Sequence, residues 1–234
     1  MKVVASIEAR MTSSRLPGKV LRPILGRPTL DLLLERLQRA TRVDAIVIAT
    51  TERPTDDPIE ELALARGVAC FRGSEHDVLA RVLGAVRSVG ADVLVEITAD
   101  CPLIDPELVD QLVEIYLSGA YDHVSNILKR TYPDGYDAQV FSVAALAEVD
   151  RLTQHPSDRE HVSLYIYSHP ERYKLYNLES DLDPDFWNIR LTVDTLDDFE
   201  VIRGIYEELY PRKPAFRLSD VIELLRRKPE WVRR

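Results

Sequence analysis

Apolar runs typical of buried strands alternate along the chain with segments whose apolar residues recur every three or four positions. The strand-like runs cover 3–7, 45–51, 68–71 and 92–100. The helical patterns cover 29–40, 57–67, 76–89 and 107–117. Strands that alternate with helices predict βαβ units, and therefore an α/β fold with a mostly parallel sheet under helices.

The pattern is looser after about residue 120, but strands and helices continue. Further strands are expected at 138–142, 173–179 and 189–193. Further helices are expected at 143–151, 158–168, 194–210 and 218–227. No internal repeat or linker-like stretch interrupts the chain, so residues 1–234 are predicted to form a single domain.

Two polar segments are predicted to meet at one edge of this sheet. One is the loop after the first strand, and the other begins at Asp100, which ends the strand at 92–100. Ligands of such sheets bind beyond the carboxyl ends of the strands, near the point where the strand order reverses. We therefore expect the opening loop and Asp100 to lie at the same edge of the sheet and to take part in a ligand site.

The distribution of charge indicates what this ligand is. The chain has a net charge of −9, which argues against a general nucleic-acid binder, but its first 50 residues hold nine Lys and Arg against four Asp and Glu. This basic N-terminal region indicates a local anionic ligand. No apolar run approaches the roughly 20 residues of a membrane span. Without a recognisable secretion signal or a cysteine framework, we expect a cytoplasmic protein with no membrane or nucleic-acid partner.

The opening loop carries the side chains that suit a phosphate ligand: Arg10, Ser13, Ser14, Arg15 and Lys19. Arg binds phosphate through a planar fork and Lys through a point charge, and a triphosphate needs several such groups. The loop is not a P-loop, because position 13 is not Gly and position 20 is not Ser or Thr. From these residues alone, a phosphate site and a solvated basic loop are equally good interpretations.

A family resemblance favours the phosphate site. The segment ARMTSSRLPGKVL (9–21) resembles the signature of the nucleotidyltransferases that make CMP-activated sugars. It is most similar to the spore coat polysaccharide biosynthesis protein F type, and more distantly to CMP-Kdo synthetase and acylneuraminate cytidylyltransferase. Later segments of that type occur in the same order and extend the resemblance over nearly the whole chain: RGSEHDVLAR (72–81), ITADCPLID (97–105), SDREHVSLYIY (157–167) and RLTVDTLDDFEVIRGIYEEL (190–209).

The resemblance implies a nucleotide-diphosphosugar transferase fold, which is a Rossmann-like three-layer α/β/α sandwich. It implies transfer of CMP from CTP to a sugar acid with release of pyrophosphate, in a protein that is commonly a homodimer. Residues 1–120 would bind the nucleotide, and residues 121–234 would bind the acceptor and include any dimer contact. Arg10, Ser13, Arg15 and Lys19 would hold the CTP phosphates. Glu8 departs from the Pro or Gln often found there, and the resemblance assigns it no role.

Two aspartates are candidates for holding Mg²⁺, which prefers oxygen ligands and is usually held by one or two carboxylates plus waters and substrate phosphates. Asp100 and Asp194 each follow a predicted strand, so their carboxylates could meet across a cleft. The alternative is that each caps the following helix or turn, which is a strong alternative for Asp194 because DTLDDFE is a good helix start. The resemblance implies a metal-binding aspartate at both positions, with Asp100 also counted as catalytic alongside Arg15 and Lys19.

Several other residues are weaker candidates for substrate binding. Ser74, Asp77 and Arg81 either shape the nucleotide or acceptor pocket or, in the case of Ser74 or Asp77, cap the helix at 76–89. The resemblance implies that Asp134, Arg159 and His161 face the acceptor, and that Arg159 pairs with the carboxylate or phosphate of the acceptor. The alternatives are a turn residue at Asp134 and a partly buried histidine at His161.

Two rival functions remain open at this stage. One is a glycosyltransferase of similar fold that consumes a nucleotide sugar, against which the basic loop argues because it suits a triphosphate. The other is a non-catalytic nucleotide-binding subunit, against which the joint presence of Lys19, Asp100 and Asp194 argues. The preference for CTP over other nucleotides rests on the resemblance alone, and the acceptor is not identified beyond an anionic, sugar-like molecule.

Overall fold

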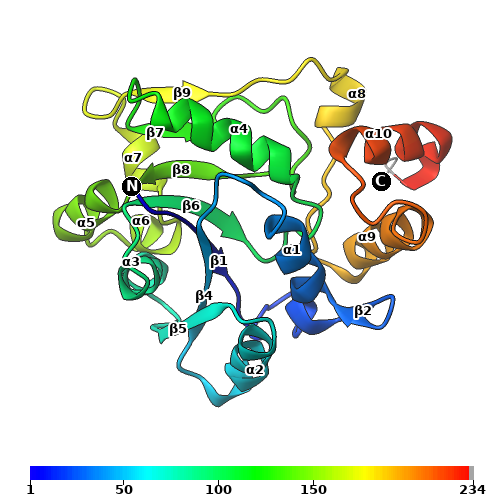
Figure 1. The fold of residues 1–234 in the computed structure, drawn as a ribbon, viewed down its shortest axis with the longest axis horizontal. Helices are drawn as coiled ribbons and strands as arrows, with labels where there is room; N and C mark the ends of the chain where they lie inside the picture. Colours follow the sequence, from blue (N-terminus) through cyan, green and yellow to red (C-terminus); the bar gives the residue numbers. More distant parts are fainter. Residues whose placement is uncertain (232–234) are drawn as a thin grey trace.

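A seven-stranded sheet forms the centre of the computed structural model, which describes residues 1–231 (Figure 1). The strand order is β5-β4-β1-β6-β8-β7-β9. The strands are β1 (Val3–Glu8), β4 (Ala45–Thr51), β5 (Ala69–Gly73), β6 (Val93–Thr98), β7 (His123–Ser125), β8 (Gln139–Ser142) and β9 (Leu175–Asn177). A separate hairpin pairs β2 (Pro23–Ile24) with β3 (Arg27–Pro28).

The sheet is mostly parallel, as the sequence pattern predicts. β8 runs antiparallel to its neighbours β6 and β7, and the remaining neighbouring pairs are parallel. The chain adds β4 and β5 on one side of β1 and then crosses to place β6 on the other side. The order therefore reverses between β1 and β6, where ligand crevices form in sheets of this kind.

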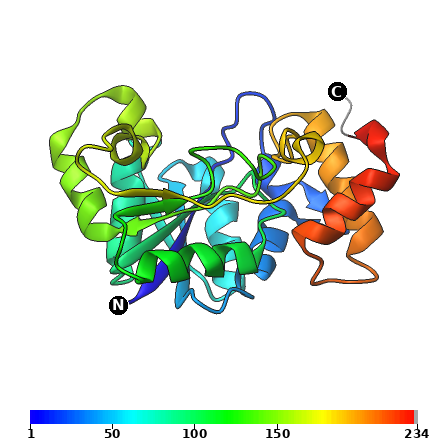
Figure 2. The same ribbon diagram turned by 90° about the horizontal axis from the view of Figure 1, so that it is seen from above.

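Helices cover both faces of the sheet and one of its ends. Their bounds are α1 (Thr29–Leu37), α2 (Asp57–Ala65), α3 (Val78–Ser88), α4 (Pro106–Leu117), α5 (Val143–Leu152), α6 (Pro156–Glu160), α7 (Leu164–Ser168), α8 (Pro184–Trp187), α9 (Leu196–Leu209) and α10 (Leu218–Arg227). Three short 3₁₀ turns are η1 (Lys19–Leu21), η2 (Pro54–Asp56) and η3 (Pro229–Trp231). Figure 2 shows α4 on one side of the sheet, α5 on the other, and α9 with α10 beyond one end.

The alternation of side chains along each strand divides the interior into two cores. Val3, Ala5 and Ile7 of β1 belong to a large core with α1, α4, α9 and α10. Val4 belongs to a smaller core with α3 and α5 on the opposite face. Because successive residues of a strand point to opposite faces, β1 and β6 are buried on both sides, which explains their continuous apolar runs. Helices on both faces give the predicted three-layer sandwich.

Two predicted elements are wrong in detail. The segment 189–193 is not a strand, and it makes one isolated bridge between Arg190 and Asp134. Leu191 and Val193 are buried, which explains the alternation, but the segment packs beside loops rather than beside a strand. The helix predicted at 158–168 is broken into α6 and α7, because the chain turns after Glu160 to bury Val162 in the core.

Within residues 1–231, no helix combines the length and the apolar character needed to cross a membrane.

Candidate functional site

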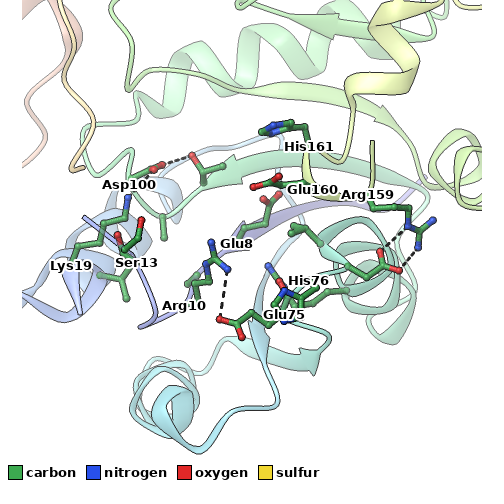
Figure 3. Close-up of a pocket in the computed structure, with 18 of the residues that line it drawn as sticks. Glu8, Arg10, Ser13, Lys19, Glu75, His76, Asp100, Arg159, Glu160 and His161 are labelled. Carbon is green, nitrogen blue, oxygen red and sulfur yellow. Dashed lines mark hydrogen bonds and ion pairs between the residues drawn. The ribbon is translucent and has the colours of Figure 1, made fainter. Parts of the chain in front are cut away.

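A cavity of about 900 Å³ opens at the carboxyl ends of β1 and β6, where the strand order reverses. Its wall comes from four segments far apart in the chain: the loop after β1, the start of α3, the end of β6 and the segment around α6 (Figure 3). Asp194 completes the wall. The predicted proximity of the opening loop and Asp100 is confirmed.

The opening loop has a defined shape because its backbone is tied at two points. The Gly18 N–H donates to the carbonyl of Met11 at 2.9 Å, and Gly18 has φ +70°, a conformation that favours glycine. The Met11 N–H donates to Oδ1 of Asp56 at 2.9 Å. Asp56 is fully buried and also accepts bonds from Thr50 and Thr51. These hydrogen bonds fix the backbone of the loop at the edge of the cavity.

Lys19, Asp100 and Asp194 converge at one end of the cavity. Nζ of Lys19, in η1, lies 3.0 Å from Oδ2 of Asp100 and 3.0 Å from Oδ1 of Asp194. Arg15 adds a second cation, with Nη2 2.8 Å from Oδ1 of Asp194. The Val193 N–H donates to the carbonyl of Asp100 at 2.9 Å, so the backbone itself holds the two aspartates together.

The ionisation of Asp194 reflects this surrounding charge. Burial alone would raise its pKa, but the hydrogen bond and charge of Lys19, followed by the charge of Arg15, outweigh burial and lower the pKa. Asp194 is therefore an anion over the whole neutral range. A carboxylate held between two cations near a second carboxylate is suited to binding a charged ligand rather than to donating a proton.

The helix-capping alternative is wrong for both aspartates. Thr195 caps α9 through a capping box with Asp198, which leaves Asp194 one residue outside the helix with its carboxylate in the cavity. Asp105 caps α4, and Asp100 lies well before that helix. At α3 the cap is Asp77, whose Oδ1 accepts from the Ala80 N–H at 3.0 Å.

The other end of the cavity is crossed by an ion pair. Arg159 of α6 is buried and forms a two-point contact with Asp77, with Nε 2.9 Å from Oδ1 and Nη2 2.5 Å from Oδ2. Its third nitrogen, Nη1, lies 2.9 Å from Oδ1 of Asp150. All three nitrogens of Arg159 are thus engaged inside the protein, which leaves this side chain poorly placed for the predicted acceptor contact.

The predicted site residues divide into those that line the cavity and those that do not. The lining includes Arg10, Ser13, Ser14, Arg15, Lys19, Arg81, Asp100, Arg159, His161 and Asp194. Ser74 and Asp134 are not part of it. Oγ of Ser74 accepts from the backbone N–H groups of His76 and Asp77, which is a turn role. The Asp134 N–H donates to the carbonyl of Ile189, and the carbonyl of Asp134 accepts from the Leu191 N–H, so this residue ties two loops together.

Comparison with known proteins agrees with this geometry. Residues 4–213 match the family described as cytidylyltransferase. The chain belongs to the cytidylyltransferase family.

It is 36% identical over 96% of its length to the spore coat polysaccharide biosynthesis protein SpsF of Bacillus subtilis, of which it covers 94%. A cytidylyltransferase structure from Leptospira borgpetersenii superposes with a TM-score of 0.93 at 33% identity, with 99% of this chain and 97% of that chain covered. CMP:2-keto-3-deoxy-manno-octonic acid synthetase, solved with CTP, has the same fold, with a TM-score of 0.68 at 20% identity over 89% of this chain and 100% of that one. The protein is therefore a nucleotidyltransferase of the predicted fold.

Sequence reasoning missed several residues of this cytidylyltransferase site. Asp56 anchors the loop through Met11, and Glu75 accepts from the Thr12 hydroxyl at 2.5 Å while lying 3.7 Å from Arg10. Glu75 also pairs with Arg53. Nothing in the sequence separates Asp56 from the neighbouring Asp57, because only the tertiary fold brings it to the loop. Glu8 carried a usable signal, namely its departure from the family pattern.

Proposed function

We propose that this protein is a Mg²⁺-dependent cytidylyltransferase that transfers CMP from CTP to a sugar acid or related anionic acceptor, for the synthesis of surface polysaccharide. The observation that carries the proposal is the convergence of Lys19 with Asp100 and Asp194 beside the basic opening loop. This combination offers cations for a triphosphate and carboxylates for a metal at one end of a cavity.

The donor set at this end suits Mg²⁺. Asp100 and Asp194 supply hard carboxylate oxygens, and both reach the same Lys19 nitrogen at 3.0 Å, so they lie close enough to share a single cation. Within residues 1–231, no group of three or more His, Cys, Asp and Glu is arranged for a metal. Two carboxylates completed by water and substrate phosphates match the usual manner of Mg²⁺ binding. When bound there, Mg²⁺ would neutralise phosphate charge and make the acceptor hydroxyl more acidic.

Side chains of the protein would bind the phosphates and neutralise the charge of the leaving group. Arg10, Ser13 and Ser14 line the same cavity as Lys19 and would bind phosphate oxygens. In the reaction, an acceptor oxygen would form a bond to the α-phosphorus of CTP, and the bond between the α-phosphorus and the oxygen that bridges it to the β-phosphorus would break, which releases pyrophosphate. The proton of the acceptor hydroxyl would pass to solvent. Lys19 and Arg15 would neutralise the charge that accumulates on the departing pyrophosphate. We also propose that the protein is located in the cytoplasm and forms a homodimer.

The first test is thermal unfolding with CTP, UTP, GTP and ATP, each with and without Mg²⁺. A nucleotide at about 100 times its Kd stabilises the folded protein by about 2.7 kcal/mol. We therefore expect CTP, but not UTP, GTP or ATP, to raise the Tm clearly. Lys19→Ala should abolish this increase and lower kcat on the order of 10²–10³-fold, measured as pyrophosphate release. Lys174→Ala, which removes an exposed lysine away from the cavity, is the matched control and should behave as wild type.

Other outcomes would point to the rival functions. A Tm increase with a nucleotide sugar but with no triphosphate would indicate a glycosyltransferase. Binding of CTP without pyrophosphate release from any anionic acceptor tested would indicate a non-catalytic nucleotide-binding subunit.

A further inference from the structure

Lys19 is held by the two carboxylates that the proposed function assigns to Mg²⁺. Its Nζ donates to Oδ2 of Asp100 and to Oδ1 of Asp194, at 3.0 Å in each case. The side chain is 12% exposed, and Figure 3 shows it pointing toward Asp100 at one end of the cavity. An ammonium group has three donors, so these two bonds leave Lys19 at most one donor for a phosphate. Most of the bonding capacity of Lys19 is therefore engaged by the aspartates.

The oxygens of the two carboxylates have few other partners of this kind. Oδ1 of Asp100 accepts from the Thr98 hydroxyl at 2.5 Å, which leaves Oδ2 to Lys19. Oδ1 of Asp194 is shared between Lys19 and Arg15, whose Nη2 lies 2.8 Å away. Among the residues that the structure describes, Lys19 is the one cation that pairs with both carboxylates. Its ammonium therefore takes the position at which a single cation balances both negative charges.

A divalent metal held by both aspartates would need this same position. Mg²⁺ binds carboxylate oxygens at about 2.0–2.1 Å. An ion at that distance from Oδ2 of Asp100 and Oδ1 of Asp194 would lie in the space that Nζ of Lys19 takes, 3.0 Å from both. Two cations so close together also repel each other, and more strongly in a partly buried site than in water. The metal and the Lys19 ammonium are therefore alternatives at these two oxygens.

We infer that Lys19 holds the metal position until the triphosphate of the nucleotide draws its ammonium away, so that metal and nucleotide bind together. The inference rests on the proposed function and adds an order of events to it. A triphosphate offers Lys19 several anionic oxygens in place of the two carboxylates, which then become available to the metal. The protein alone binds a divalent cation weakly, because the cation must displace Lys19. Since coupling between two ligands is reciprocal, bound metal also raises the affinity for the triphosphate.

The exchange needs only the side chain of Lys19 to move. The backbone of this residue is fixed, because its carbonyl accepts from the Thr29 hydroxyl at 2.7 Å and from the Arg22 N–H at 3.3 Å. Beyond this anchor, the ammonium is carried on a flexible four-carbon stem. Nζ can therefore leave the aspartates for a phosphate in the same cavity while the loop keeps its shape.

Arg15 is less suited to this role, although it also contacts Asp194. Among the described residues, Arg15 forms no ion pair with Asp100. Its side chain is 59% exposed, against 12% for Lys19, and exposed ion pairs contribute little because water readily replaces them. Removing the charge of Arg15 should therefore change the affinity for a metal less than removing that of Lys19. Arg15 thus offers a matched control at the same carboxylate.

The first arm of the test measures how tightly the protein binds Mn²⁺ without nucleotide, by electron paramagnetic resonance of the unbound ion. Mn²⁺ prefers the same carboxylate and water oxygens as Mg²⁺ and is visible by this method. Lys19→Met removes the ammonium but keeps an unbranched side chain, and we expect it to bind Mn²⁺ about tenfold more tightly than wild type. Lys19→Arg keeps a cation and should bind Mn²⁺ as weakly as wild type.

Two further variants locate this effect. Asp194→Asn added to Lys19→Met should remove the gain in affinity, which places the ion at the carboxylates. Arg15→Met should gain less than Lys19→Met, because the two variants lose the same charge but only Lys19 pairs with both aspartates. No gain in Lys19→Met, or an equal gain in Arg15→Met, would overturn the inference.

The second arm uses the unaltered protein and follows Lys19 itself. The protein is treated briefly with acetic anhydride, without Mn²⁺ and with Mn²⁺ above the Kd found in the first arm, and acetylation is quantified by peptide mass spectrometry. Because the aspartates engage the amine, we expect Lys19 to react several-fold faster when Mn²⁺ is bound. The exposed Lys174 is the internal control and should react equally in both samples. Unchanged acetylation of Lys19 would show that the metal binds without displacing it, which contradicts the inference.

CTP separates a failure of this inference from a failure of the proposed function. Wild-type protein should gain stability from CTP and should bind Mn²⁺ about tenfold more tightly when CTP is present. If wild type gains no stability from CTP, the proposed function itself fails. If CTP stabilises wild type but neither the affinity of Lys19→Met for Mn²⁺ nor the acetylation of Lys19 changes, only the inference about Lys19 fails. Circular dichroism checks that Lys19→Met is folded, and the second arm does not depend on that variant.

Discussion

His123 shows how burial changes the chemistry of a single residue. It is fully buried on β7, its ring stacks on Phe141 with centroids 5.8 Å apart, and its Nε2 lies 3.1 Å from Oε1 of Gln139. Burial lowers its pKa to about 4, although the Gln139 hydrogen bond acts in the opposite direction. The imidazole is therefore neutral in the folded protein at pH values at which it would be charged in the unfolded chain.

This difference makes stability depend on pH. Because the folded pKa lies below the unfolded value near 6.5, the unfolded state takes up the proton first, and stability is lost as the pH falls from about 6.5 toward 4. The loss attributable to His123 is about 3 kcal/mol over this range. Chemical unfolding from pH 7 to 4 should show the loss in wild type and a smaller one in His123→Gln. The exposed His155→Gln should behave as wild type, and an equal loss in His123→Gln would contradict the assignment.

Among single residues, those that converge around Lys19 were easier to predict than those that support the loop. Arg15, Lys19, Asp100 and Asp194 were identified from a short motif and from positions near strand ends, and the structure brings them together. Asp56, which anchors the loop, was not identified. Its contact with Met11 spans 45 residues, and no local pattern records a contact of that kind.

Among the elements, the turn at Gly135 decides where the segment before α9 lies. Gly135 has φ +108°, and a Cβ placed on it would lie 2.5 Å from the carbonyl oxygen of Leu191. The hydrogen bonds of Asp134 to Ile189 and Leu191 flank this contact. A side chain at residue 135 would therefore push away the segment that leads to Asp194.

Gly135→Ala should lower both stability and activity. We expect a loss of about 2–4 kcal/mol from overpacking and an unfavourable φ, and a lower kcat because Asp194 moves relative to Asp100. Gly119→Ala is the matched control, since Gly119 also has a positive φ, +77°, but has no atom within 4 Å of its Cβ position. Denaturant unfolding and pyrophosphate release measure the two effects. Equal losses in both variants would show that backbone strain alone, and not the contact with Leu191, is responsible.

For the molecule as a whole, the pair of Arg159 with Asp77 joins the two halves of the chain across the cavity. Asp77 caps α3 in the first half, and Arg159 lies on α6 in the second half, 82 residues later. The same guanidinium also binds Asp150 of α5. This arrangement fixes the distance between the two walls of the cavity.

Arg159→Ala should therefore lower the free energy of unfolding rather than weaken the binding of the acceptor. Removing the guanidinium leaves Asp77 and Asp150 without their partner, and we expect a loss of about 1–3 kcal/mol because the two carboxylates are partly exposed. The Tm increase with CTP should persist, and Asp77→Asn should reproduce part of the loss. An unchanged Tm together with a raised KM for the acceptor would instead support the contact between Arg159 and the acceptor that the family resemblance implies.

The amino-acid sequence by itself determined the order of strands and helices in the first half, the mostly parallel sheet under helices and the basic loop at its edge. Each of these follows from local periodicity or from a short motif, as in the runs at 3–7 and 92–100. Only the tertiary structure decided that 189–193 packs beside loops and that Arg159 is held by carboxylates. These outcomes depend on contacts between residues tens of positions apart, which the periodicity of a segment does not encode.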